Sequence, residues 1–318
     1  MKKILVLLIF VSLLNSCDDG NMQVESFDFS AANTESCGIG TADFFIYKIT
    51  GNEALIIKVN ETIFENAVGK DSATIGSNAT LIYRLYDGPV SISTLCSSIP
   101  ASNPKVIEEW TATGGKMDIL TNAVKSTNET TGSTRITSFN HNITLTNVTF
   151  NTGNGEQRNS EIVFGSYSTN VVPVGVFTGD LKRCNNNDLF LIAGSQVLTL
   201  SLDDATYTDL FANIPTTAGQ PRTALINATN TMDVKILSAA VLDNVICGDP
   251  AGMPAILERW NAKTGVENLS GIISVETTTN GTGFDHIVTL KNVIFQNPVS
   301  LLDFTFGTNY VFGTYTSN

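Results

Sequence analysis

Apolar and polar side chains alternate along most of this chain with a period of two residues. In the segment VLTLSL, Leu198, Leu200 and Leu202 fall on one side of an extended chain, and the threonine and serine between them fall on the other. The segment FDHIVTLKN at 284–292 alternates in the same way. Gly and Asn separate such segments, and β-branched and aromatic residues are frequent within them. The pattern predicts an all-β chain of half-buried antiparallel strands.

Helical patterns are rare in comparison. The segment DDATYTDLFANIP, residues 203–215, is the place where we expect a short helix or turn. We count about seven or eight strand-like segments in each half of the chain, which favours a β-sandwich.

The chain contains one sequence unit twice. The matched segments occur in the same order in both halves, with similar spacing, which indicates a tandem duplication with small loop insertions. They are VIEEW at 106–110 with ILERW at 256–260, FNHNITLTNVTF at 139–150 with FDHIVTLKNVIF at 284–295, and FGSYST at 164–169 with FGTYTS at 312–317. We therefore expect two tandem antiparallel β-sandwich domains related by internal duplication, at residues 23–169 and 170–318. The stretch from Val171 to Gly179 is predicted to be the first strand of the second domain.

The N-terminus has the pattern of an export signal. Two lysines precede an apolar run from Ile4 to Leu14, which has the length of a signal-peptide core and is too short to span a bilayer as a stable helix. The run ends in Leu14, Asn15, Ser16 and Cys17, which resembles the lipobox of bacterial lipoproteins, although Asn15 stands where a small apolar or hydroxyl residue is commoner.

This resemblance implies a signal peptide at 1–16 and a lipidated Cys17 that begins a tether at 17–22. The partner it implies is the membrane, reached through the lipid anchor. The acidic pair Asp18–Asp19 is similar to the flank that some Gram-negative bacteria use to direct lipoproteins to the outer face of the outer membrane. In other bacteria an aspartate here retains the protein at the inner membrane. The resemblance therefore predicts the cell envelope, and the outer membrane with its periplasmic or surface face is the expected location.

The remaining four cysteines are Cys37, Cys96, Cys184 and Cys247. An exported chain meets an oxidising compartment, so two disulfides are expected, and four cysteines allow three pairings. Because each copy of the repeat carries its own pair, we predict the links Cys37–Cys96 and Cys184–Cys247.

The charge of the chain narrows the class of partner. The formal net charge is −12, and both halves carry a similar acidic excess. Such a distribution argues against nucleic acid and against an anionic lipid surface as partners.

Motifs for a cofactor or metal are absent from the sequence. There is no His-Glu-x-x-His, no paired Cys-x-x-Cys, no phosphate-binding glycine loop and no Gly-x-Ser-x-Gly. We therefore expect no cofactor, no metal and no catalytic residue of these types. Two carboxylates that meet in space could still form a glycosidase site, and Glu108, Glu109 and Glu258 are the candidates beside the tryptophans.

Two duplicated aromatic residue types are the remaining candidates for function. Trp110 and Trp260 are the only tryptophans and occupy equivalent positions. On an exposed strand they could stack on sugar rings, whereas on a core-facing strand they would be buried. His141 and His286 are also equivalent, and we interpret them as one structural histidine inherited twice, inside or at the edge of the fold, and hydrogen-bonded.

The sequence as a whole resembles the uncharacterised β-domains of exported envelope lipoproteins, a likeness that implies no particular activity. We expect a lipid-anchored cell-envelope protein of a non-enzymatic binding or display type, with a glycan or an envelope protein as its ligand. The alternatives are a polysaccharide hydrolase that uses paired carboxylates, and a structural subunit of an envelope complex.

Overall fold

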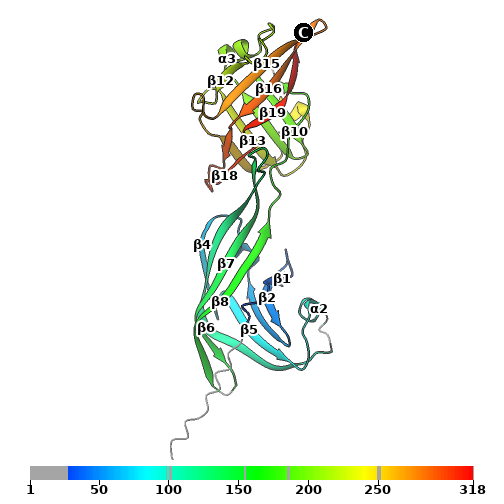
Figure 1. The fold of residues 1–318 in the computed structure, drawn as a ribbon. Coiled ribbons are helices and arrows are strands. Elements are labelled where there is room, and N and C mark those ends of the chain that lie inside the picture. Colours follow the sequence, from blue (N-terminus) through cyan, green and yellow to red (C-terminus); the bar gives the residue numbers. More distant parts are fainter. Residues whose placement is uncertain are drawn as a thin grey trace, which may run out of the picture. The chain divides into compact units, whose positions relative to one another are not determined.

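The chain is mostly β-strand, arranged in antiparallel sheets, as the alternation predicts (Figure 1). A computed structural model describes residues 28–97, 99, 102–153, 155–184, 187–248 and 252–317. The predicted signal peptide, Cys17 and the tether lie outside these residues. Among the described residues, no helix combines the length and the apolar composition needed to cross a bilayer.

The elements of the first half are mostly strands. They are β1 (Glu35–Cys37), β2 (Phe45–Thr50), β3 (Glu53–Val59), the 3-10 helix η1 (Glu61–Ile63), β4 (Gly69–Thr74), β5 (Ala79–Tyr86), α2 (Ile92–Cys96), β6 (Val106–Thr127), β7 (Thr134–Asn151) and β8 (Glu156–Asn170).

The elements of the second half are likewise mostly strands, with short helices between some of them. They are β9 (Lys182–Arg183), β10 (Asp188–Ala193), β11 (Gln196–Ser201), α3 (Asp204–Leu210), β12 (Arg222–Leu225), β13 (Thr231–Leu237), α4 (Asp243–Ile246), β14 (Ile256–Ala262), β15 (Ile272–Asn280), β16 (Gly283–Lys291), β17 (Ile294–Gln296), β18 (Asp303–Thr305) and β19 (Asn309–Ser317). The helix predicted within 203–215 is α3.

The described residues form two compact units. The first unit holds residues up to Phe64, Lys70–Leu120 and Asn142–Tyr167, and the second holds Glu65–Gly69, Thr121–His141 and the chain from Ser168 onward. The second unit thus includes the end of the β6–β7 hairpin, which the expected limits of 23–169 assign to the first domain. Strands β6, β7 and β8 each contribute residues to both units.

In the first unit, β1, β2, β3, β5 and β6 are neighbours in that order, and every pair is antiparallel. One face of these strands packs into the main core, to which Ile46, Leu55 and Ile57 belong. The opposite face carries a smaller apolar cluster that includes Tyr47 and Ile56. Leu95 of α2 packs against that second face, so β2, β3 and β5 are buried on both sides.

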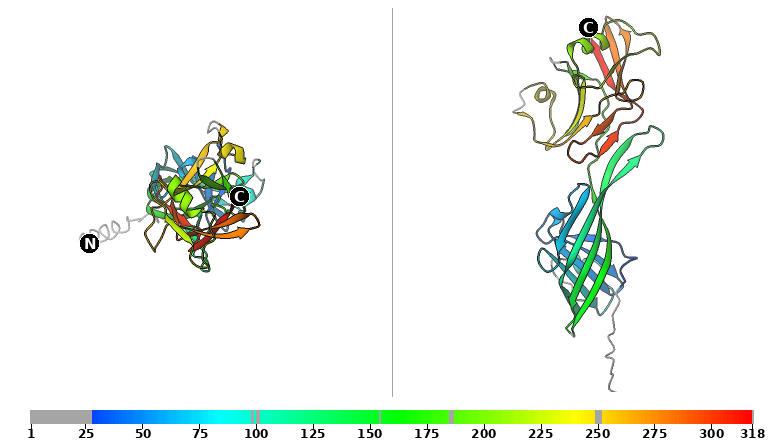
Figure 2. Two further views of the ribbon diagram at one scale, coloured as in Figure 1. Left: turned by 90° about the horizontal axis from the view of Figure 1, so that it is seen from above. Right: turned by 90° about the vertical axis from the view of Figure 1, so that its left-hand side faces the viewer.

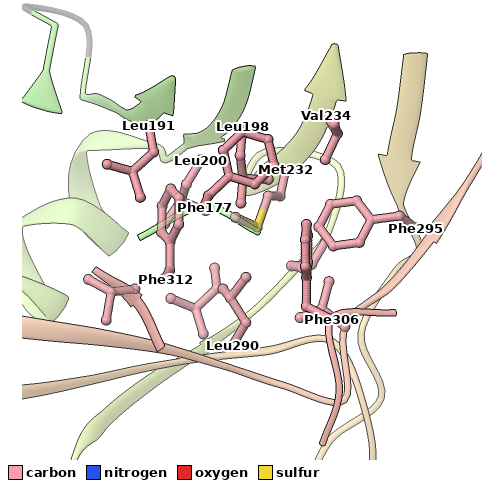
Figure 3. Close-up of a cluster of buried hydrophobic side chains, with 14 of the residues drawn as sticks. Phe177, Leu191, Leu198, Leu200, Met232, Val234, Leu290, Phe295, Phe306 and Phe312 are labelled. Atoms are coloured by element: carbon pink, nitrogen blue, oxygen red, sulfur yellow. The ribbon is translucent and has the colours of Figure 1, made fainter. Parts of the chain in front are cut away.

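The second unit contains two sheets (Figures 1 and 2). One has the order β18-β17-β14-β13-β11-β10-β9, and the other has the order β12-β15-β16-β19. Its main core draws side chains from both sheets: Leu198 and Leu200 come from β11, Leu290 comes from β16, and Phe312 comes from β19 (Figure 3). The period-two pattern of β16 is confirmed, because His286, Val288 and Leu290 are all buried.

The expectation of half-buried strands is wrong for β11. Leu198 and Leu200 face the main core, and the opposite face of β11 is buried as well. Val197 belongs to a second apolar cluster, together with Leu237 and Val241, against which Val245 and Ile246 of α4 pack. The Thr side chain at 199 is therefore buried despite its polar parity.

The stretch from Val171 to Gly179 is not a strand, which corrects the sequence prediction. Pro173 lacks the N–H group that would hydrogen-bond to a neighbouring strand. The backbone groups around it form hydrogen bonds with side chains instead. The Gln196 amide donates to the Pro173 carbonyl at 3.3 Å and accepts from the Gly175 N–H at 2.8 Å. The Arg135 Nε donates to the Val174 carbonyl at 3.0 Å.

Both predicted disulfides are present. Cys37 is bonded to Cys96, and Cys184 is bonded to Cys247. Cys37 ends β1 and Cys184 directly follows β9, so each bond ties the segment that carries α2 or α4 to the end of a strand and holds the apolar cover over the outer face of its sheet.

Candidate functional site

The two tryptophans are buried, so of the two interpretations that the sequence leaves open, the structure favours the core position over a ligand-stacking surface. Trp110 is 3% exposed and Trp260 is 6% exposed. The Trp110 ring lies 4.7 Å from the ring of Tyr83, and the Trp260 ring lies 5.2 Å from that of Phe304, measured between centroids. Both positions lie on the core-facing parity of their strands, where the second layer of side chains covers them.

The glutamates near the tryptophans are held by partners of their own. The Trp110 indole N–H donates to Glu108 at 2.7 Å, and the Trp260 indole N–H donates to Glu258 at 3.1 Å. Residues two apart on a strand share a face, which is why the same bond forms in both units. Glu109, on the opposite face, pairs with Arg84 at 2.6 Å. In these contacts the three carboxylates accept hydrogen bonds from neighbouring side chains, which is a structural role.

His286 lies at the centre of a directed chain of hydrogen bonds in the second unit. It is fully buried, and its Nδ1 lies 2.9 Å from the Thr277 hydroxyl. Its Nε2 lies 3.0 Å from the Ser317 hydroxyl, which donates in turn to the Asn213 carbonyl oxygen at 2.6 Å. Because the Ser317 proton is used there, Nε2–H is the donor and Nδ1 accepts from Thr277. Arg222 completes the chain by donating to the Thr277 hydroxyl at 3.1 Å.

His141 has an equivalent set of partners. Its ring is also fully buried, with Nδ1 at 2.9 Å from the Thr121 hydroxyl and Nε2 at 2.9 Å from the Thr169 hydroxyl. Thr169 donates to the side-chain oxygen of Asn66 at 2.5 Å. The interpretation of both histidines as interior, hydrogen-bonded residues is confirmed.

These networks favour the neutral imidazole. Burial is the main cause that lowers the pKa of both His141 and His286 below the ordinary value. In the tautomer that the hydrogen bonds require, Nε2 is a donor and does not act as a base toward the neighbouring hydroxyl.

Sequence reasoning missed the two asparagines that end these chains. A signal was present, because FEN at 64–66 corresponds to FAN at 211–213 with the offset of the repeat. Phe211 packs edge-on against His286, with 5.4 Å between ring centroids. Both copies of the Phe-x-Asn motif therefore supply a hydrogen-bond acceptor, and the second copy also supplies a ring contact with its histidine.

A metal centre is not evident in the described part of the chain, where no three His, Cys, Asp or Glu side chains gather as a cation site would require.

The second unit also contains an apolar cavity of about 480 Å³, a volume typical of small-molecule sites. All of its lining residues belong to this unit. They come from residues 66–67, from the start of β7, from the segment at 171–174, from β13 and β14, and from β18 with the loop that leads into it. The pairing of Thr134 with Thr305 holds the first residues of β7 beside β18 and so closes one wall.

The cavity has a buried floor and an exposed apolar rim. The floor includes Ile136, Phe139 and Phe304, all of which belong to the core of the unit. On the rim, Leu257 is 65% exposed and Val299 is 90% exposed. Isolated exposed apolar residues are common, but a group of them around a cavity is typical of a binding site.

The polar groups of the lining are few. Glu258 accepts from the Trp260 indole, and Arg259 pairs with Asp233 at 2.9 Å. Arg135 is the third charged residue of the lining. Two arginines against one glutamate make the lining positive, in a chain whose formal net charge is −12.

The guanidinium of Arg135 is held by carbonyls and aromatic rings. Its Nη1 donates to the carbonyls of Thr134 and Thr305, each at 2.7 Å, in addition to the Nε bond to Val174. Its central carbon lies 5.3 Å from the ring centroid of Phe304 and 4.6 Å from that of Phe306. These are cation–π distances, so the charge sits above two ring faces at the edge of the cavity.

Carboxylates do not neutralise this charge within the described ranges. Every ion pair found there joins other residues. Burial lowers the pKa of Arg135, and the ionisable group that opposes this effect is the phenol of Tyr310. An arginine stays protonated despite such a shift, so the cavity contains an uncompensated positive charge.

Comparisons with known proteins leave the chain without an assigned family. No protein family model matches it, and no curated protein or solved structure matches it.

Proposed function

We propose that this chain is a lipid-anchored protein of the cell envelope that binds an apolar ligand in the cavity of its second unit. Its work is binding or display, without catalysis. The observation that carries the binding proposal is the cavity of about 480 Å³ with a buried apolar floor and an exposed apolar rim. With both tryptophans buried, an apolar ligand suits the molecule better than a glycan does.

Two observations support the location. The first is the lipobox-like sequence that ends at Cys17. The second is the pair of disulfides, which persist in oxidising compartments outside the cytoplasm. The outer membrane, on its periplasmic or surface face, is the compartment we propose.

We further propose that the two units derive from one duplicated β-sandwich. Each copy of the sequence repeat has its own disulfide, its own Trp–Glu hydrogen bond and its own chain of Thr, His, hydroxyl and Asn groups, although both histidine networks lie in the second unit. The order β2-β3-β5-β6 in the first unit corresponds to β10-β11-β13-β14 in the second. A common ancestor accounts for these coincidences with few assumptions.

The anchor is tested by metabolic labelling with a radioactive or alkyne-tagged fatty acid. The native chain is expected to incorporate the label and to partition into detergent, and Cys17→Ser is expected to do neither. Label that persists in the variant contradicts the assigned position of the lipid.

The binding site is tested with Nile red, a neutral fluorescent apolar probe, and the chain from residue 18 onward, which keeps every described residue. Omitting the anchor avoids detergent, which would compete for the cavity. Leu257→Glu should weaken probe binding, because it places a charge at the rim. Ile107→Glu is the matched control, since Ile107 occupies the equivalent strand position in the first unit and is 61% exposed. Equal effects of the two variants, or no binding at all, would contradict the proposal.

A further inference from the structure

We propose that the ligand of this cavity is an aliphatic molecule with an anionic head group, of the fatty-acid type, whose carboxylate pairs with Arg135. This inference rests on the proposed function and adds the chemical class of the ligand. It follows from the charge, the hydrogen-bonding capacity and the surroundings of one side chain.

The first argument is the missing counter-ion. Arg135 borders an apolar cavity and stands over the rings of Phe304 and Phe306. Charges that leave water are normally paired, since their desolvation is unfavourable. The described residues supply carbonyl and aromatic partners to Arg135, but no carboxylate. A ligand anion would supply the missing partner in surroundings that strengthen the attraction.

The second argument is the number of unused donors. A guanidinium has five N–H groups. Three of those on Arg135 are directed to the carbonyls of Val174, Thr134 and Thr305. Across the residues that the structure describes, the two N–H groups of Nη2 have no hydrogen-bond acceptor. The three occupied donors fix the plane of the group, so that a carboxylate would meet an oriented guanidinium.

The third argument concerns the rest of the ligand. The floor residues Ile136, Phe139 and Phe304 offer only hydrocarbon, and the exposed rim residues Leu257 and Val299 extend this surface outward. A sugar or a polar peptide would leave its own hydrogen-bonding groups unpaired there, which is costly. An aliphatic chain has no such groups and gains from the burial of its surface.

The other polar groups of the lining do not compete with this assignment. Among the described lining residues Glu258 is the one acidic group and accepts the Trp260 N–H, and Arg259 pairs with Asp233, a carboxylate that Lys235 shares. Arg135 is therefore the lining cation that has no carboxylate partner among the described residues. The sequence repeat does not duplicate it, since the position equivalent to Arg135 at the offset of the histidines is Asn280. The inference therefore concerns the second unit alone.

The experiment measures calorimetric binding of three amphiphiles with ten-carbon chains, below their micelle concentrations, to the chain from residue 18 onward. They are decanoate, decanol and decyltrimethylammonium. Decanoate is expected to bind with one site per chain. It should bind at least about tenfold more tightly than the cation of equal chain length, the size of effect expected of a charge-assisted hydrogen bond. Because this comparison uses the native chain, it does not depend on the folding of any variant.

The variants then locate the effect. Arg135→Gln is expected to weaken decanoate binding about tenfold or more and to change decanol binding by less than about twofold, because only the anion meets the charge. Arg135→Lys, which keeps the charge without the fork geometry, should restore part of the decanoate affinity. Ile107→Glu serves again as the distant control and should leave both affinities unchanged.

The outcomes separate this inference from the proposed function. If Nile red and decanol bind the cavity but decanoate and the cation bind equally well, the anionic class is wrong and the apolar site stands. The same conclusion follows if Arg135→Gln weakens decanoate and decanol to the same extent. If none of the amphiphiles binds and Nile red does not bind either, both the site and the inference are wrong.

Discussion

Acidification should destabilise the second unit through its two buried histidines. His141 and His286 both belong to this unit, both are fully buried, and both accept a hydrogen bond at Nδ1 from a threonine hydroxyl. Protonation of either ring would place a charge inside the fold and turn that acceptor into a donor facing another donor. The structure therefore binds these protons more weakly than the unfolded chain does, which is the reason their pKa values are lowered.

The sign and size of the effect follow from proton linkage. Well above the ordinary histidine pKa of about 6.5 both histidines are neutral in the folded and unfolded states, and they contribute no pH dependence there. As the pH falls below that value the unfolded chain takes up protons first, so the free energy of unfolding decreases. Between the unfolded and folded pKa values each histidine contributes a slope of about 1.4 kcal/mol per pH unit, and the pair contributes up to about 2.7 kcal/mol per pH unit.

The assay is urea denaturation between pH 7.5 and pH 5, followed by tryptophan fluorescence, in which Trp260 supplies the signal of the second unit and Trp110 that of the first. Carboxylates interfere little in this range, because their ordinary pKa values lie near 4. His141→Gln and His286→Gln remove one titrating group each, while an amide can still accept from threonine and donate to a hydroxyl. Each variant should lose about half of the slope.

The variant that combines His141→Gln and His286→Gln tests whether these two histidines account for the pH dependence. It should have a nearly flat stability between pH 7.5 and pH 5, although its stability at neutral pH will be lower than that of the native chain. If the double variant keeps the full slope, the protons are bound elsewhere, and the argument from the two buried networks is refuted.

Three further predictions concern the packing. Replacing Cys37 or Cys184 together with its disulfide partner by serine should lower the free energy of unfolding by about 4 kcal/mol in each case, because the sequence separations of 59 and 63 are nearly equal; urea titrations that show a loss in only one unit would contradict this. Thr277→Val, nearly isosteric, leaves an imidazole acceptor and an arginine donor without their hydroxyl and should be destabilising by about 2 kcal/mol, whereas an unchanged urea midpoint would show that the network is not stabilising. Acrylamide should quench Trp110 and Trp260 only weakly in the folded chain and strongly in 6 M urea, and efficient quenching of the folded chain would mean that an indole is exposed.

The repeated features of the fold could be predicted from the sequence because they depend on local order along the chain. The period of two identified β-strands, and the repeat assigned each cysteine to a partner within its own copy. The repeat also indicated that His141 and His286 have equivalent surroundings. The order of residues along the chain was sufficient for these conclusions. The repeated Phe-x-Asn motif was also present in the sequence, and it marks the two asparagines of the histidine networks.

Periodicity gives the side of a strand on which a residue lies, but not what covers that side. Trp110 and Trp260 would have the same sequence pattern on an open sheet as in a core, and only the packing of a second layer decided that they are buried. The same limit explains β11, whose outer face is covered by the α4 segment. For the stretch after Val171, the side chains of Gln196 and Arg135 decided against a strand.

The candidate site could be identified only from the tertiary structure. Its cavity brings together Arg135 of β7, Leu257 of β14 and Val299 of the loop before β18, which are far apart in the chain and share no motif. From the sequence alone, a single arginine within a strand is expected to be an ordinary surface charge. Only the folded chain shows that three carbonyls hold its guanidinium and that no carboxylate of the described residues pairs with it, because ion pairs depend on distance in space. The sequence thus determined the kind of fold and its repetition, and the packing of distant segments determined where a ligand could bind.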